Sequence, residues 1–578
     1  MILGIMIVPN LALVAAAWST ATQARSISQN GAQTILQDVS AEHFNCDIPS
    51  ALDPSKDGLP ASKDIFSGDE ALLLQVKRHG TIVKIPTVSY DDEGEPGEDP
   101  RWEIFYDLQK AFATLYPNLH LRMTRETVNT FGLVYTIKGT DTKLKPLMLT
   151  AHQDVVPVAD VSTWKYPPFS AHFDGQWLWS RGASDDKNSL SALMSALETL
   201  LSHESWIPKR TIILALGFDE ECSGRRGAGE IGKYLEELYG PDSMALLLDE
   251  GGMGLESLGN DTLYALPAVM EKGHVDIWLE LSVNGGHSSA PFPHTGIGIM
   301  AEFVNQLESN PWKPKLIKGS PIYNHFVCQA RYSPDAAPNI TKLINKGDLE
   351  TLTEELATLD RPTQYRIQTS QAVDYFFGGV KINAMPEYIK IGVNHRIAPQ
   401  DSIPAVKANI LKQIKPIVKK FGLSVSAFKG ENNNPEIELD ESLDGDVDAM
   451  YEVEYNGSLV LTSSQTTKVA PISPASGPVW DVFSGTIQHS FAFDGGKVIP
   501  VGELMTGNTD TRHYLNLTSH IYRWTPTRQG HTFDAHTVNE RIDMYAHMEA
   551  LRFYYDLIRN FDASPVATVE EQQGVEEL

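Results

Sequence analysis

Hydrophobic and polar residues follow two periodicities in the first half of the chain. Apolar side chains recur at helical spacing in residues 71–80 and 101–115, and residues 190–203 form the clearest helical segment. Between residues 133 and 248, short apolar runs typical of buried strands alternate with helical segments. This alternation predicts an α/β fold with a mostly parallel sheet covered by helices.

The pattern changes near His274. Residues 275–283 alternate apolar and polar side chains, as a half-exposed antiparallel strand does. We expect further strands of this kind at 387–396 and 423–428, with helices at 297–306 and 403–421 between them. The pattern predicts an inserted α+β lid domain over residues 271–468. Its last part, 431–468, is acidic, Asn-rich and turn-rich, which indicates a hairpin excursion.

The remaining segments complete a predicted domain plan. At 578 residues the chain is too long for a single core. Residues 65–270 and 469–562 are assigned to one domain, which the lid interrupts. Residues 25–64 are predicted to be an N-terminal arm. Residues 563–578 are polar and acidic, and we expect a mobile tail there.

The first 24 residues predict a route into the secretory pathway. Residues 1–18 are apolar and uncharged, and small residues suited to cleavage follow at 22–24, as in a signal peptide. An uncleaved membrane anchor is the alternative, although the segment is near the lower length limit for a spanning helix. The vacuole lumen or the exterior would be the destination. Sequons, which permit glycosylation, start at Asn260, Asn339, Asn456 and Asn516.

Composition narrows the classes of partner. The chain is 42% hydrophobic and 21% charged, as globular proteins are. Its net charge of −27 disfavours nucleic acid, because phosphate binding needs an excess of Lys and Arg. Three cysteines exclude a fully paired set. Cys46 and Cys328 could form one disulfide, and Cys222 is interpreted as a small packing residue.

Five side chains that bind metals follow strand-like runs in the order of the chain. Carboxylates at the C-terminal ends of strands are where α/β sheets place ligands and chemistry. Two imidazoles and three carboxylates suit a pair of zinc ions with a shared bridge and a metal-activated water. The predicted ligands are His152, Asp185, Glu221, Asp249 and His536.

Together with these residues, three motifs make the chain resemble the M20 metallopeptidases. The motifs are residues 85–89 (IPTVS), 181–187 (RGASDDK) and 508–512 (NTDTR), and the likeness is closest to the fungal Gly-Xaa carboxypeptidase, carboxypeptidase S. The resemblance covers roughly residues 65–560. It implies a zinc exopeptidase fold with two Zn²⁺ per chain and an inserted lid that also mediates dimerisation.

The resemblance also implies roles around the metals. His152 would be a ligand, and Asp154, two positions further along the strand, would hold the imidazole from behind. Asp185 would bridge both metals, with a cis peptide before Asp186. Neighbouring residues in extended chain point to opposite sides, so Glu221 can face a metal while Glu220 faces the substrate as general base and acid.

Substrate contacts are predicted from the lid and from a late loop. By resemblance, His287 would stabilise the tetrahedral oxyanion across a dimer. Asn383 would hold the scissile carbonyl, and Arg396 would bind the substrate α-carboxylate, with Arg512 as the competing carboxylate binder. Gly507 would leave room for substrate near the backbone. Family members often have Asp where this chain has Asn394, beside Arg396.

Three functions follow as hypotheses. The first is a di-zinc exopeptidase that removes the C-terminal residue of short or N-blocked peptides. The second is an N-acyl-amino-acid hydrolase or synthase on the same fold, because the sequence does not reveal the lining of the substrate pocket. The third is a non-catalytic binding protein, which the full ligand set together with Glu220 disfavours. A homodimer through the lid is expected, and a membrane contact only if the N-terminal segment is an anchor.

Overall fold

A computed structural model describes residues 44–259, 261–430 and 453–569. The predicted signal peptide, the first part of the arm, the sequon at Asn260, most of the hairpin excursion and most of the tail lie outside these ranges. Within the described ranges, no helix combines the length and the apolar character needed to cross a membrane.

An eight-stranded mixed sheet forms the body of the molecule. Its strand order is β1-β2-β6-β3-β7-β20-β10-β19. At its centre β3 (Leu147–His152) runs parallel to β6 (Ile212–Gly217) and to β7 (Leu246–Asp249), and β7 runs parallel to β20 (Ile521–Arg523). The outer strands are β1 (Thr124–Val128), β2 (Gly132–Ile137), β10 (Ala268–Glu271) and β19 (Glu503–Met505). The parallel centre matches the α/β prediction.

Helices cover both faces of this sheet. Alternate residues of β3 enter different cores, with Leu147 and Leu149 in the larger core and Met148 in the smaller one. Because both faces are buried, every residue of β3 and β6 is buried, which explains their unbroken apolar runs. The larger core contains side chains of α3 (Gly68–Val83), α4 (Ile104–Leu115), α6 (Lys187–Ser202), α14 (Pro478–Ser490) and α15 (Met544–Ala563), and the smaller core is covered by α7 (Ala228–Tyr239).

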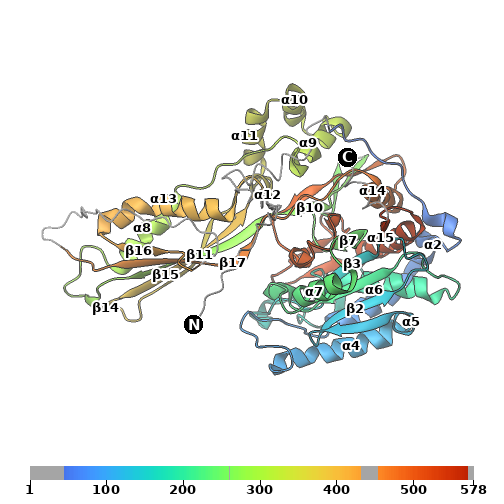
Figure 1. Ribbon diagram of the computed structural model, residues 1–578, viewed down its shortest axis with the longest axis horizontal. Helices are drawn as coiled ribbons and strands as arrows, with labels where there is room; N and C mark the ends of the chain where they lie inside the picture. Colours follow the sequence, from blue (N-terminus) through green and yellow to red (C-terminus); the bar gives the residue numbers. More distant parts are fainter. Residues whose placement is uncertain (1–43, 260, 431–452, 570–578) are drawn as a thin grey trace, which may run out of the picture.

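A second sheet forms a lobe that projects away from the first (Figure 1). Its order is β13-β15-β11-β17-β16, with strands β13 (Ala372–Gly378), β15 (Tyr388–Ile397), β11 (Gly273–Ser282), β17 (Ser458–Thr467) and β16 (Ser424–Ala427). Burial alternates along β11, as the sequence predicts. Helices α8 (Gly296–Glu308) and α13 (Ile403–Phe421) pack on the buried face, and the small ladder of β12 (Gly286–His287) and β14 (Ala384–Met385) lies at the far end (Figure 1).

Four helices within the predicted lid region form a separate unit. They are α9 (Pro321–Tyr332), α10 (Pro338–Lys346), α11 (Leu349–Leu359) and α12 (Arg361–Arg366), and they enclose an apolar core of their own. A disulfide joins Cys328 of this unit to Cys46 of the N-terminal arm. In addition, His325 Nδ1 lies 2.6 Å from Glu503 Oε2 on β19. The unit is therefore bonded to the body of the molecule, although the sequence places it with the lid.

Shorter elements complete the description. They are α2 (Ser62–Ile65), α5 (Pro117–Arg122), the three-stranded sheet of β18 (Lys497–Pro500), β9 (Thr262–Ala265) and β8 (Leu255–Leu258), and the four-stranded sheet of β21 (Thr532–Phe533), β22 (Arg541–Asp543), β5 (Trp177–Trp179) and β4 (His172–Phe173). The loop between β21 and β22 carries His536.

Candidate metal centre and active site

The parallel strands bring the predicted ligands to one edge of the large sheet. His152 ends β3, and Glu221 lies in a 3-10 turn (Glu220–Cys222) shortly after β6. Asp185 precedes α6, and the peptide between Asp185 and Asp186 is cis, as the resemblance implies. His536 joins them from the loop between β21 and β22. Parallel strands end at the same edge of a sheet, which explains why His152 and Glu221 converge. Asp185 and His536 come from the segments after β5 and before β22, two strands that pair in the small four-stranded sheet.

Asp185 lies between the two imidazoles. Its Oδ1 is 3.1 Å from His152 Nε2, and its Oδ2 is 3.0 Å from His536 Nε2. His536 Nε2 is also 3.0 Å from Glu221 Oε2. Ligand atoms of His152, Asp185 and Glu221 all lie within 4.8 Å of one another. A carboxylate that directs one oxygen to each imidazole has the geometry of a bridging ligand.

Glu250, and not Asp249, approaches His152 after β7. Glu250 Oε1 lies 3.5 Å from His152 Nε2, and a second potential ligand group consists of His152, Asp186 and Glu250. Asp249 belongs to neither group among the described residues. Its Oδ1 instead accepts a hydrogen bond of 2.8 Å from Thr150 Oγ1 within the sheet. Its other oxygen, Oδ2, is buried without a hydrogen-bond partner. Asp249 therefore stays a predicted ligand, and Glu250 is a second candidate beside it.

The carboxylate of Asp154 connects His152 to the turn that contains Glu220 and Glu221. It lies 3.3 Å from His152 Nδ1, which leaves Nε2 facing the cluster. It also accepts hydrogen bonds from Ser89 Oγ at 2.6 Å and from the backbone N–H groups of Glu220 and Glu221, each at 3.1 Å. Although burial acts to raise it, hydrogen bonding to His152 keeps the pKa of Asp154 below its ordinary value. One carboxylate thus orients the imidazole and the Glu220–Glu221 turn.

The electrostatics of the cluster fit bound cations. Burial raises the pKa of Glu221 and of Glu250 to about 7, and it raises that of Glu220 well above its ordinary value, with the charge of Glu250 adding to the effect. Glu221 Oε1 is buried without a hydrogen-bond partner. So many carboxylates can all stay ionised in a buried site only if positive charge compensates them. Histidine and carboxylate ligands are those that zinc prefers.

Arg512 lies beside Glu220, and Arg396 is within electrostatic reach of it. Arg512 Nη2 is 3.5 Å from Glu220 Oε1. Arg396, on β15 of the lid, donates a hydrogen bond of 3.0 Å from Nη1 to Asn508 Oδ1, and Asn508 lies in the same loop as Arg512. Both predicted carboxylate binders are therefore connected to one loop, and Arg512 contacts the predicted proton carrier. An added methyl group at Gly507 would meet only the end of the Met505 side chain, at 3.2 Å, so the backbone there is open.

His287 and Asn383 lie elsewhere, on the ladder at the far end of the lid lobe (Figure 1). His287 is exposed, and its Nδ1 accepts a hydrogen bond from Ser289 N at 3.1 Å and lies 2.8 Å from Ser289 Oγ. Asn383 is also exposed. Among the described residues, neither has a recorded contact with the metal cluster of its own chain.

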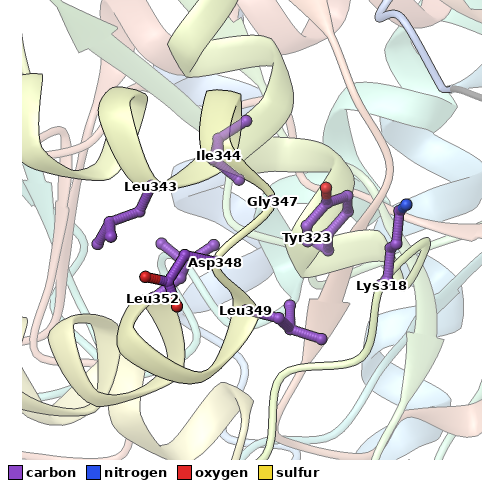
Figure 2. A pocket seen from close by; sticks show the side chains of 8 residues that line it. All are labelled: Lys318, Tyr323, Leu343, Ile344, Gly347, Asp348, Leu349 and Leu352. Atoms are coloured by element: carbon purple, nitrogen blue, oxygen red, sulfur yellow. The ribbon is translucent and has the colours of Figure 1, made fainter.

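A small cavity lies apart from this chemistry, in the helical unit (Figure 2). Its volume of about 30 Å³ has room for one or two water molecules. Side chains from α9, α10 and α11 line it, among them Tyr323, Ile344 and Leu352 (Figure 2). It is too small for a peptide and contains none of the predicted site residues.

Sequence reasoning missed Glu250 and Asn508 as site residues. The alternation used for Glu220 and Glu221 applies equally to Asp249 and Glu250, and was the available signal. For Asn508 the sequence offered only its place in the NTDTR motif. Its partner Arg396 is distant in the chain, and only the fold brings the two together.

An α/β body with histidines and carboxylates at its strand ends, and with an inserted α+β lid, defines the class of two-domain metallohydrolases. The family model described as Peptidase family M20/M25/M40 matches residues 148–560. The chain belongs to this family, as the resemblance implied.

Curated relatives cover most of the chain. An uncharacterized carboxypeptidase of Schizosaccharomyces pombe is 39% identical over 536 residues, which is 90% of this chain and 86% of the relative. Carboxypeptidase S of Saccharomyces cerevisiae is 36% identical over 533 residues, 88% of each chain. Human N-fatty-acyl-amino acid synthase/hydrolase PM20D1 is 31% identical over 503 residues, 86% of this chain and 89% of the relative.

Solved structures share the fold at low sequence identity. Human carnosine dipeptidase 1 superposes with a TM-score of 0.58 at 14% identity, covering 87% of this chain and 99% of that chain. The metallo-carboxypeptidase Sso-CP2 of Sulfolobus solfataricus gives a TM-score of 0.55 at 16% identity, covering 84% and 99%. The predicted catalytic domain with an inserted domain is thereby confirmed as a fold.

Proposed function

We propose that this protein is a metal-dependent exopeptidase that removes the C-terminal residue from short or N-blocked peptides. The observation that carries the proposal is the position of Glu220. Its backbone is bound by the same Asp154 that orients His152, while its side chain faces Arg512. A proton carrier thus lies between a cation site and two groups that can bind a carboxylate. The kinship with carboxypeptidase S supports this reading.

His152, Asp185, Glu221, Glu250 and His536 would hold two zinc ions, with Asp185 as the bridge. The two oxygens of Asp185 face different imidazoles, Oδ1 facing His152 and Oδ2 facing His536, and this supports a bridging role for Asp185. Bound zinc supplies a polarised water of lowered pKa. His536 is 55% exposed at its side chain, which leaves this side of the centre open to solvent.

Glu220 would move the proton. As the water oxygen bonds to the carbonyl carbon, Glu220 accepts the proton that the water releases. When the C–N bond breaks, Glu220 passes this proton to the leaving amine. Burial and the nearby carboxylates raise the pKa of Glu220, and the positive charge of bound zinc would counteract this, so that an ionised Glu220 could accept the proton and then return it.

Arg396 would bind the carboxylate of the C-terminal residue. Its guanidinium provides a planar pair of donors, and Asn508 holds one of its nitrogens. Arg512, next to Glu220, is the alternative binder. Gly507 lies in the same loop, where an open backbone would allow the substrate to approach. A carboxylate at a fixed distance from Glu220 would restrict cleavage to the last peptide bond.

His287 and Asn383 would complete the site of a second copy of the chain. They lie at the end of the lid, away from the cluster of their own chain, beside Ile382, which is 99% exposed. Strand β13 is an edge of the lid sheet and exposes Tyr375, Phe376 and Phe377. Unpaired apolar edges commonly pair with another chain, which supports a homodimer through the lid.

The compartment would be an oxidising one. The disulfide between Cys46 and Cys328 supports passage through the secretory pathway, because cytosolic thiols are kept reduced. A vacuolar or secreted location agrees with the apolar N-terminal segment.

An N-acyl-amino-acid hydrolase or synthase is the second candidate, supported by the kinship with human N-fatty-acyl-amino acid synthase/hydrolase PM20D1. Both substrate classes present a carboxylate next to the scissile amide, so they would use Arg396 alike. The test compares kcat/KM for an N-blocked Gly-Leu dipeptide with that for an N-fatty-acyl leucine. We expect the peptide to be preferred, and a preference for the fatty-acyl amide would favour the second candidate.

A further inference from the structure

Glu540 is a fully buried carboxylate four residues beyond His536, and the reaction described above makes no use of it. It lies at the end of the loop that carries His536, just before β22. Its side chain does not belong to either potential ligand group in the described part of the chain. Burial of a charged group needs compensating donors, so its contacts identify what it does.

Five donors converge on the Glu540 carboxylate, and all come from the segment that precedes α6. Oε2 accepts hydrogen bonds from Arg181 Nη1 at 2.6 Å and from Gly182 N at 2.9 Å. Oε1 accepts from Ser184 N at 2.9 Å, Ser184 Oγ at 3.1 Å and Asp185 N at 3.2 Å. The carboxylate therefore fixes the backbone up to and including the residue that would bridge the metals.

The same contact joins the two ligand loops. Arg181 Nη2 donates to the carbonyl of Thr537, the residue after His536, at 3.2 Å. In addition, the backbone carbonyl of Glu540 accepts from Ser180 N at 3.1 Å. The segments 180–185 and 536–540 are thus hydrogen-bonded to each other near both of their ends. Next to these hydrogen bonds, His536 Nε2 lies 3.0 Å from Asp185 Oδ2.

We propose that Glu540 is a positioning residue of the metal centre, which sets the distance between Asp185 and His536 before metal binds. The inference rests on the proposed function, because it assumes that these two residues bind metal. All five contacts donate to Glu540, so only a group with two acceptor oxygens satisfies them. The side-chain amide of a glutamine at this position would place its own N–H donors against the donors of the segment 180–185. That segment would then have to move.

Zinc affinity measures this role directly. The Glu540→Gln protein, stripped with a chelator, is titrated with Zn²⁺ in competition with a chromophoric chelator. We expect a dissociation constant raised about 10- to 100-fold, as is typical when a residue that orients a ligand is changed. Glu540→Asp, which keeps both oxygens on a shorter stem, should recover part of the affinity.

Glu198 provides the matched control. It is a buried glutamate on α6 that accepts hydrogen bonds from Asn118 N, Asn118 Nδ2 and Leu119 N, about three and a half helical turns away from Asp185. Glu198→Gln should lower the unfolding temperature of the stripped protein, yet leave the zinc dissociation constant within about twofold. A lower unfolding temperature in Glu540→Gln with unchanged zinc affinity would mean a purely structural role and would overturn the proposal.

Two further variants distinguish a failure of the positioning role of Glu540 from a failure of the proposed function. If Glu540→Gln does not fold, Ser184→Ala and Glu540→Asp take its place, and unchanged zinc affinity in both overturns the role of Glu540. Asp185→Asn tests the metal centre itself. If Asp185→Asn binds zinc as tightly as the unaltered protein, the proposed function fails. If that variant loses zinc and Glu540→Gln does not, only the positioning role fails.

Discussion

Asn508 Oδ1 accepts a hydrogen bond of 3.0 Å from Arg396 Nη1 and thereby ties a lid strand to a loop of the body. The Nδ2 group of Asn508 donates to the carbonyl of Lys272 at 2.7 Å, between β10 and β11, where the chain enters the lid. Asn508 thus holds the proposed carboxylate binder at the junction of the two parts. The Asn508 side chain therefore contributes both to the position of the proposed substrate-binding arginine and to the position of the lid.

The Asn508→Ala variant should bind carboxylate substrates more weakly. A lost hydrogen bond to a charged group costs about 1.5–3 kcal/mol, so KM for an N-blocked dipeptide should rise at least about tenfold. The same dipeptide with a C-terminal carboxamide should show no comparable change. Arg396→Met should give the same pattern with a larger effect, and Asn310→Ala, an exposed asparagine on the lid, should leave both substrates unchanged. An equal effect on the two substrates would contradict the assignment.

Glu250→Gln should lower metal content, whereas Asp249→Asn should not. Glu250 Oε1 faces His152 Nε2, while Asp249 accepts from Thr150 inside the sheet. Elemental analysis after dialysis should find close to two zinc ions in Asp249→Asn and fewer in Glu250→Gln. Because Asp249 is buried and hydrogen-bonded, its variant should unfold at a lower temperature. The opposite metal contents would identify Asp249, and not Glu250, as the ligand.

Local sequence patterns predict the fold well where burial is periodic. The alternation in β11 and the apolar runs of β3 and β6 identify half-exposed and fully buried strands directly. The predicted helix 403–421 agrees with α13 at both ends, because a Ser N-cap and a terminal glycine mark its limits. The α/β body and the inserted lid therefore follow from the chain alone.

Contacts between distant segments could not be predicted in the same way. The attachment of α9 to β19 through His325 and Glu503 depends on tertiary packing, and so does the pairing of Asn508 with Arg396. Asp249 and Glu250 are a different case. Asp249 ends β7 and Glu250 follows it. The sequence alone does not fix which of the two carboxylates faces the cluster, because this depends on how the backbone turns after the strand.

Complementation should show whether His287 acts in a second copy of the chain. His287→Ala and Glu220→Ala are each expected to be inactive. When the two proteins exchange subunits, one site of the mixed dimer would contain Glu220 from one chain and His287 from the other. Activity should then return in part, measured as release of the C-terminal amino acid. Verified exchange without recovery would place His287 within its own chain's site or outside catalysis.

Removal of the disulfide should affect stability and not chemistry. It links the arm to α9 over a separation of 282 residues, and loss of a native disulfide typically costs about 2–5 kcal/mol. The Cys46→Ser/Cys328→Ser protein should unfold at lower denaturant concentration, with kcat/KM at 25 °C close to that of the unaltered protein. A large loss of kcat/KM in the folded variant would indicate that the arm and the helical unit contribute to the active site.

Zinc titration of the stripped protein, followed by peptide hydrolysis and metal content together, tests the central claim most directly. Activity toward an N-blocked dipeptide should be absent without metal and reach its plateau at two zinc ions per chain. The Glu220→Gln protein should bind the same two ions, yet turn over at least about 10²-fold more slowly, because only proton transfer is lost. Hydrolysis by the stripped protein, or full activity of Glu220→Gln with two zinc ions bound, would contradict the account.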